Sequence, residues 1–275
     1  AACGAAAALL LVILFVCPKI VTTVAICFLS VVGIRELLHT TGIATRNTML
    51  YAAMDMGVFL PLCCYFGLSL TAIAALIVVF ALIVFADALR AYPEVHFSSV
   101  TGSLFAGLAI PLCLGSIARI LGMEQGRYLV LVPILIPFLA DAGAYFAGCS
   151  LGKHKLAPVL SPHKTVEGAV GGLLTGVVSM LLYGLVLKFG FGRDYNFLYA
   201  AVYGLVGSLV SIVGDLSFSM IKRETGIKDY GTLFRAHGGV LDRFDSVIFL
   251  LVDDLDAKAG VYENIVANPR RRHES

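Results

Sequence analysis

The acidic side chains that could bind a metal lie near one charged stretch of an apolar chain. Of the 20 Lys and Arg and 18 Asp and Glu residues, nine fall within residues 219–245. Asp242 and Asp245 stand three residues apart, which places both carboxylates on one face of a helix. Asp215 directly follows a long apolar run. Inserting a carboxylate at membrane depth is energetically unfavourable, so such a residue usually has a function. If these three acids converge at the edge of the apolar segments, they suit Mg²⁺, which prefers oxygen ligands and keeps phosphates and waters as further partners.

Basic and glycine residues lie between these acids. They are Lys222, Arg223, Lys228, Arg235, His237, Gly238 and Gly239. The cations could neutralise a polyphosphate, and the glycine turn would let backbone amides approach phosphate oxygens. One alternative is a basic loop that contacts anionic lipid headgroups, although such a loop does not need the two adjacent acids. Another alternative is that Asp215 is neutralised within its own helix by Ser219 or Lys222, which share its face.

A second polar stretch, residues 141–168, begins with Asp141 at an apolar edge. Ser161, Lys164 and Thr165 form a cluster of hydroxyls and a cation just before the next apolar segment. The alternative is an ordinary helix start at Ser161-Pro162, with Thr165 as a capping residue. Capping explains one hydroxyl but leaves the lysine without a role. The two histidines here, His154 and His163, are interpreted as solvated loop residues.

The elements that position these residues are apolar helices. The chain is 59% hydrophobic and 14% charged, against about 25% charged in soluble domains. We expect an all-α, polytopic integral membrane helical bundle of eight or nine transmembrane helices, since long apolar runs cross lipid as helices. The segments are 4–17, 20–37, 49–66, 70–89, 98–117, 128–148, 166–188, 197–220 and a weaker 241–252.

We interpret residues 1–275 as one membrane domain, with few motifs in 1–120 and the catalytic region in 141–250. The seven cysteines form no CxxC pair and are interpreted as free thiols, mostly buried. Gly168, Gly172 and Gly176 recur every four residues, which predicts a ridge for close helix packing.

The distribution of basic residues predicts which side of the membrane carries the polar stretches. The connections near 38–48, 90–99, 150–165 and 221–240 should share one side and carry nine basic residues, while the opposite connections carry five. The positive-inside rule places the richer side in the cytoplasm. Both polar stretches would then meet cytosolic nucleotides, and the protein would lie in the plasma (inner) membrane.

The motifs resemble those of the phosphatidate cytidylyltransferase, or CDP-diacylglycerol synthase, family. The signature reads Ser-Met-Ile-Lys-Arg from Ser219, Lys-Asp-Tyr-Gly from Lys228, and His-Gly-Gly-Val-Leu-Asp-Arg-Phe-Asp from His237. The Ser-Pro-His-Lys-Thr-Val-Glu-Gly run from Ser161 resembles a second family region. Arg235 departs from the pattern, because the family usually has Pro or Gly there.

The resemblance implies a nucleotidyltransferase that converts CTP and phosphatidic acid into CDP-diacylglycerol and pyrophosphate, a step of phospholipid synthesis, with Mg²⁺ as cofactor. It assigns the metal to Asp215, Asp242 and Asp245. Catalytic roles fall to these acids and to Lys222, Arg223 and His237. Substrate and phosphate binding fall to Ser161, Lys164, Thr165, Lys228, Gly238, Gly239 and Arg243.

The expected partners are CTP, phosphatidic acid and membrane lipids, with no nucleic acid; pairing of the chain into a homodimer is left open. Two alternatives to this function differ in class. One is a CTP-dependent transferase that acts on another membrane lipid, such as a polyprenol or an ether lipid. The other is an ion-coupled transporter, which would place its acids near mid-membrane rather than at one boundary beside a basic loop.

Overall fold

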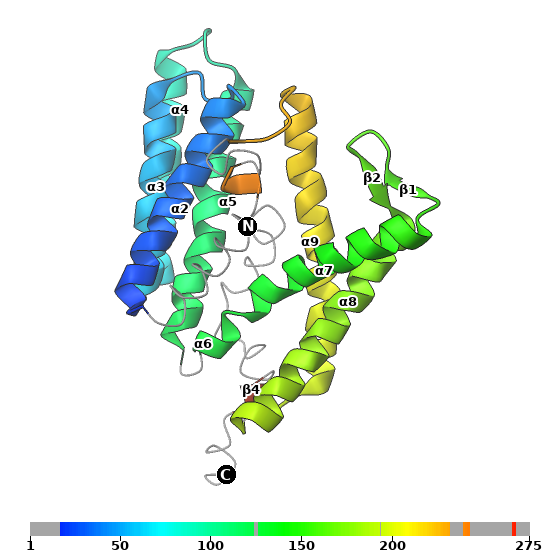
Figure 1. Ribbon diagram of the computed structural model, residues 1–275. Coiled ribbons are helices and arrows are strands. Elements are labelled where there is room, and N and C mark those ends of the chain that lie inside the picture. Colours follow the sequence, from blue (N-terminus) through cyan, green and yellow to red (C-terminus); the bar gives the residue numbers. More distant parts are fainter. Residues whose placement is uncertain (1–16, 124–125, 193, 232–238, 243–265, 268–275) are drawn as a thin grey trace. The chain divides into compact units, whose positions relative to one another are not determined.

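Figure 1 shows a computed structural model of the chain, which describes residues 17–123, 126–192, 194–231, 239–242 and 266–267. The chain folds as two compact units. The first unit is formed by residues 1–123 and 221–252, and the second by residues 124–220 and 253–275. The described residues 221–231 and 239–242 of the charged stretch therefore belong to the same unit as the N-terminal helices.

Four long helices pack side by side in the first unit (Figure 1). They are α2 (Lys19–Thr40), α3 (Asn47–Phe66), α4 (Leu70–Arg90) and α5 (Phe97–Gly122). Helices α2, α3 and α5 contact one another, and α4 packs on α3 and α5. Their shared core is aliphatic, with Ile34, Met49, Leu60 and Ile110 fully buried.

Local signals define the ends of these helices. Ser69 caps α4, because its hydroxyl accepts a hydrogen bond from the Ala72 N–H at 3.3 Å. Gly67 ends α3 with a φ of 62°, a left-handed conformation that glycine adopts at little cost. Arg46, just before α3, donates to Asp87 near the end of α4 at 2.9 Å. This pair supports the prediction that the connections near 38–48 and 90–99 share one end of the helices.

The second unit contains three long helices and two small antiparallel β-pairs. Its elements are α6 (Gly126–Leu129), α7 (Val132–Leu151), β1 (Lys155–Ala157), β2 (Ser161–Thr165), α8 (Val166–Leu185), the π-helical η1 (Val186–Gly190), β3 (Asp194–Tyr195), α9 (Phe197–Glu224) and β4 (Val266–Ala267). Helix α9 belongs to this unit as far as Met220. The β1–β2 hairpin joins α7 to α8, and β3 pairs with β4.

Glycines allow α8 to approach its neighbours closely, as the four-residue ridge predicts. A Cβ added at Gly168 would lie 2.8 Å from the Ala144 carbonyl oxygen of α7, and one at Gly172 would lie 3.0 Å from the Ala140 carbonyl oxygen. One at Gly176 would lie 3.0 Å from the Gly204 carbonyl oxygen of α9. All three distances are shorter than ordinary van der Waals contacts of a Cβ atom, so the packing role of the ridge is confirmed.

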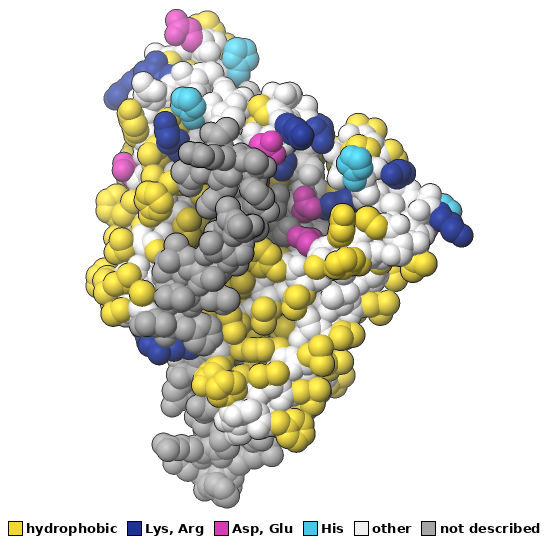
Figure 2. Space-filling model, viewed as in Figure 1, with side chains coloured by type: hydrophobic (Ala, Val, Ile, Leu, Met, Phe, Trp, Pro, Cys, Tyr) yellow, Lys and Arg dark blue, Asp and Glu magenta, His cyan; other side chains and the backbone are white. Residues whose placement is uncertain are grey.

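Seven helices within the described residues are long and apolar enough to cross a membrane. They confirm the predicted segments 20–37, 49–66, 70–89, 98–117, 128–148, 166–188 and 197–220. The chain is an integral membrane protein built from apolar helices. Predicted segment 4–17 lies outside the described residues, as does all of 241–252 after its first two residues. Figure 2 shows hydrophobic side chains over much of the visible surface of α8, as expected for a lipid-facing helix.

The prediction of free, mostly buried cysteine thiols is confirmed in part. Cys27, Cys64 and Cys113 are free thiols buried in the first unit, as expected for small hydrophobic packing residues. Cys149 of α7 differs, since its thiol is free and exposed. Cys3 lies outside the described residues.

Candidate functional site

The β1–β2 hairpin positions Lys164 and Thr165 at the start of α8. Lys155 pairs with Thr165, and Ala157 pairs with Ser161. Residues 161–165 are therefore a strand, and the alternative of a helix that starts at Ser161 is wrong. The capping alternative for Thr165 is confirmed, because its hydroxyl accepts the Gly168 N–H at 3.1 Å.

Glu167, in the first turn of α8, fixes the other end of this hairpin. Its carboxylate accepts the Lys153 N–H at 3.1 Å and the His154 N–H at 3.2 Å, and it contacts the His154 Nδ1 at 2.6 Å. His154 is exposed, as expected for a solvated loop residue. The residues that follow α7 are thus tied to the first turn of α8 by hydrogen bonds from backbone N–H groups to the Glu167 side chain.

A cavity of about 420 Å³ lies in the second unit beside this hairpin. Its polar lining comes from α7, the hairpin and α9, namely Asp141, Tyr145, His163, Lys164, Thr165 and Asp215. The exposed Cys149 also lines it. Two acids, a lysine and a hydroxyl from elements far apart in sequence thus meet in one concave site. One of the acids is Asp141, for which the sequence predicted a position at an apolar edge but no role.

Asp215 forms an ion pair with Lys164 in this cavity. The exposed fractions of the two side chains are 22% and 27%. Ser219, one turn later on α9, donates to the second oxygen of Asp215 at a long 3.4 Å. The sequence alternatives named Ser219 or Lys222 as partners of Asp215. Ser219 is a weak one, and the cation is Lys164 from the hairpin.

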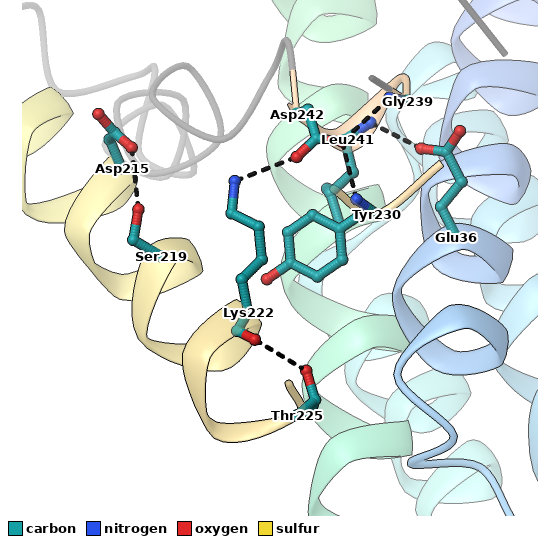
Figure 3. A network of polar contacts seen from close by, with 9 residues as sticks. All are labelled: Glu36, Asp215, Ser219, Lys222, Thr225, Tyr230, Gly239, Leu241 and Asp242. Atoms are coloured by element: carbon teal, nitrogen blue, oxygen red, sulfur yellow. Dashed lines mark hydrogen bonds and ion pairs between the residues drawn. The ribbon is translucent and has the colours of Figure 1, made fainter. Parts of the chain in front are cut away.

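The charged stretch forms a second cluster, in the first unit. Lys222 donates to Asp242 Oδ1 at 3.1 Å, and the other oxygen of Asp242 accepts the N–H groups of Tyr230 at 2.8 Å and Gly239 at 3.0 Å (Figure 3). The Lys222 ammonium also lies 5.2 Å from the centroid of the Tyr230 ring, which is fully buried. Three donors therefore engage Asp242, and they hold Tyr230 and Gly239 beside Lys222 near the end of α9.

Glu36 of α2 is a member of this cluster that the sequence prediction missed. Its Oε2 accepts the Leu241 N–H at 2.9 Å (Figure 3). One available signal was its position, a carboxylate near the polar end of an apolar segment, as for Asp215. That signal does not name a partner 205 positions away in the sequence.

The described part of the chain places the remaining predicted residues as follows. Ser161 is half-buried in β2 but does not line the cavity, while Arg223 and Lys228 are exposed near the end of α9. Gly239 belongs to the Asp242 cluster. Four predicted residues lie outside the described residues, as does Arg235; the four are His237, Gly238, Arg243 and Asp245.

The predicted metal ligands are distributed between the units. Asp215 lies in the second unit and Asp242 in the first. Among the residues that the structure describes, no three His, Cys, Asp or Glu side chains form a group that could hold a metal ion. Within its own unit, Asp215 shares the cavity with Asp141, so the cavity offers carboxylate oxygens together with the Lys164 ammonium. That donor set suits a phosphate group accompanied by a hard cation.

Comparison with known proteins identifies relatives of this chain. A phosphatidate cytidylyltransferase of Staphylococcus saprophyticus is 41% identical over 128 residues, which cover 46% of this chain and 48% of the relative. One from Haemophilus influenzae is 41% identical over 123 residues, or 45% of this chain and 43% of the relative. One from Staphylococcus aureus strain COL is 43% identical over 130 residues, with coverages of 46% and 48%.

These alignments span about half the length of each relative. The profile of the cytidylyltransferase family extends much further, because it matches residues 2–252. It includes the N-terminal helices, in which the sequence motifs are sparse. It also includes the two regions that supply the cavity and the Asp242 cluster. The chain belongs to the cytidylyltransferase family.

Proposed function

We propose that this protein is a phosphatidate cytidylyltransferase, which joins CTP and phosphatidic acid into CDP-diacylglycerol and pyrophosphate. The observation that carries the proposal is the cavity in the second unit, which brings together Lys164, Thr165 and Asp215. Lys164 and Thr165 directly precede α8, and Asp215 lies in the C-terminal half of α9. The relatives named phosphatidate cytidylyltransferase support the choice of substrates.

The location of the cavity fits a lipid phosphate. Both α8 and α9 are long enough to cross a membrane, and the cavity lies by the polar hairpin at the first turn of α8. Phosphatidic acid carries its phosphate at the membrane interface, with acyl chains in the apolar layer. Exposed hydrophobic residues on α8, such as Val170 and Leu174, continue from this end of the helix and would accompany those chains.

The reaction requires alignment and charge neutralisation. An oxygen of the lipid phosphate bonds to the α-phosphorus of CTP, and the bond from that phosphorus to the β-phosphate oxygen breaks, so pyrophosphate leaves. Both reactants are anions, so the protein must offset their repulsion. Lys164 supplies one ammonium inside the cavity. The family signature adds Arg223 and Lys228, which are exposed, as further proposed phosphate-binding cations.

The proposal includes Mg²⁺ as cofactor, supported by the carboxylates of the cavity and by the family resemblance. Asp215 and Asp141 fit the role by chemistry, because they are oxygen donors in a cavity that also holds the Lys164 ammonium. Asp242 and Asp245 remain proposed ligands from the signature. When bound, Mg²⁺ would neutralise part of the triphosphate charge.

The proposed location is the plasma (inner) membrane with the cavity facing the cytoplasm. Its support is the excess of basic residues in the connections near 38–48, 90–99, 150–165 and 221–240. CTP is a cytosolic nucleotide, so the cavity must open on that side for the reaction to proceed. A cysteine introduced into the hairpin should react with an impermeant maleimide only when the cytoplasmic face is accessible.

The test is incorporation of label from CTP into lipid. Purified protein in detergent is incubated with labelled CTP, Mg²⁺ and phosphatidic acid, and in parallel with a polyprenyl phosphate in place of phosphatidic acid. We expect label in the lipid phase only with phosphatidic acid, and none after addition of EDTA. Absence of incorporation by folded wild-type protein would contradict the activity, and label only with the polyprenyl phosphate would change the substrate. Full activity in EDTA would remove the proposed metal.

A further inference from the structure

We propose that Glu36 of α2 is a positioning residue, which holds the backbone of the signature segment 239–242 in the arrangement that the reaction needs. The effect on turnover rests on the function proposed above, while the structural effect can be measured separately. Glu36 lies in the N-terminal helices, far in sequence from the motifs, and its side chain is half-buried.

The first contact joins the side chain of Glu36 to the backbone of the signature. The carboxylate accepts the Leu241 N–H at 2.9 Å, where residues 241–242 begin a helical turn. The first N–H groups of a helix lack partners within the helix, and a negative charge there is favourable. Hydrogen bonds to a charged group are stronger than neutral ones. Glu36 therefore stabilises the start of the turn that carries Asp242.

The second contact explains two small residues of the signature. A Cβ added at Gly231 would lie 2.6 Å from the Glu36 Cδ, and one added at Gly239 would lie at the same distance from that atom. Gly231 does not adopt a positive φ. The backbones of both glycines come so close to Glu36 that a side chain there would displace its carboxylate. The small residue at each position is thus matched to Glu36.

The third contact fixes Leu241 on α2. The Leu241 side chain is buried, and its Cδ1 would lie 3.9 Å from a Cβ at Gly33, three residues before Glu36. Helix α2 consequently holds both the side chain and the amide of Leu241. The next residue, Asp242, accepts N–H groups from Tyr230 and Gly239 and pairs with Lys222. A shift of the Leu241 amide would move this whole cluster.

The experiment compares four variants and one control variant with the wild type. Glu36→Ala removes the acceptor, Glu36→Gln retains an amide oxygen, Gly231→Ala pushes the carboxylate away, and the double variant combines the first and third changes. Glu94→Ala removes an exposed carboxylate of the same unit and serves as the matched control. Each protein is assayed for kcat and for the KM of CTP, and hydrogen exchange is measured at the amides of residues 239–242.

We expect Glu36→Ala and Gly231→Ala each to lower kcat about tenfold or more, on the scale of a lost charge-assisted hydrogen bond. Amide exchange at Leu241 should become faster in both. Glu36→Gln should recover most of kcat, within about threefold of the wild type, because an acceptor remains. The double variant should be no worse than Glu36→Ala, since the clash requires the Glu36 side chain.

Several results would overturn the proposal. These are unchanged Leu241 exchange in Glu36→Ala, full additivity in the double variant, and equal loss of kcat in Glu36→Gln and Glu36→Ala. If Glu36→Ala does not fold, Glu36→Gln and Gly231→Ala decide the question through the same exchange measurement. If the wild type makes no CDP-lipid, the proposed function fails, yet faster Leu241 exchange in Glu36→Ala would still support the positioning role.

Discussion

Two acid–lysine pairs lie near the ends of helices in this protein, and they differ in how much of each carboxylate remains available. The Asp215–Lys164 pair of the second unit lines an open cavity, with side chains 22% and 27% exposed. The Asp242–Lys222 pair of the first unit is 9% and 15% exposed. Asp242 also accepts two backbone N–H groups, whereas the additional partner of Asp215 is a hydroxyl at 3.4 Å.

The difference indicates that Asp215 and Asp242 have different roles. A carboxylate has about four lone-pair sites. Three donors already engage Asp242, so in this arrangement its main effect is to hold Lys222, Tyr230 and Gly239 together. Asp215 retains room for a ligand. The Lys164 ammonium can leave the Asp215 carboxylate and pair with a phosphate oxygen instead. We therefore propose that the Asp215 cavity carries binding chemistry and that Asp242, in the arrangement of this structure, organises the residues around it; the following predictions test this comparison.

The largest expected effect is on activity at Asp215. Asp215→Asn should lower CDP-lipid formation by at least about hundredfold, because a charge used in an electrostatic site is lost. Its melting temperature in detergent should change less than that of the Asp242→Ala variant, since the Asp215–Lys164 pair is less buried than the Asp242–Lys222 pair. Label incorporation and thermal unfolding are measured on the same preparation. A large loss of stability with activity retained would reverse the roles given to the two acids.

A large effect on stability is expected at Asp242. Asp242→Ala leaves the mostly buried Lys222 ammonium without its carboxylate, and breaking a fully buried pair typically costs about 3–5 kcal/mol. It also removes the acceptor of two backbone N–H groups. The melting temperature should therefore fall much further than in Asp215→Ala, which is the matched variant of the other pair. Equal melting temperatures for the two variants would contradict the organising role of Asp242.

An intermediate effect is expected for chemical labelling of Cys149. This thiol is exposed and lines the cavity. CTP with Mg²⁺, or phosphatidic acid, should slow its reaction with a maleimide several-fold by occupying the cavity, whereas ATP should not. Cys149→Ser identifies the labelled residue in mass spectrometry. If saturating substrate leaves the labelling rate unchanged, the cavity does not bind substrate.

The smallest effect is expected at Ser219. Its hydroxyl donates to Asp215 at 3.4 Å, a long distance for a hydrogen bond. Ser219→Ala should therefore lower activity by no more than about threefold, below the loss expected for an ordinary hydrogen bond to a charged group. Initial rates at saturating CTP are sufficient for the measurement. A loss comparable to that of Asp215→Asn would show that Ser219 contacts substrate instead of only supporting the acid.

Much of the fold follows from the amino-acid sequence. Seven apolar segments were located from hydropathy, because only helices bury their own backbone polar groups in lipid. The packing role of the Gly168 ridge followed from its four-residue spacing. The hairpin at residues 155–165 was not predicted. Its strands are short and polar, and they are defined by pairing with each other and by the Glu167 contacts.

The sequence by itself also determined which residues are candidates for the chemistry. Acids at apolar edges and the motif spacing identify Asp215, Lys164 and Lys222. Only the tertiary structure decided their partners. Lys164 pairs with Asp215, Lys222 pairs with Asp242, and Glu36 joins the signature from α2. The physical reason is that periodicity specifies the face of a helix on which a side chain lies. Which distant element meets that face depends on how the helices pack, which local sequence does not encode.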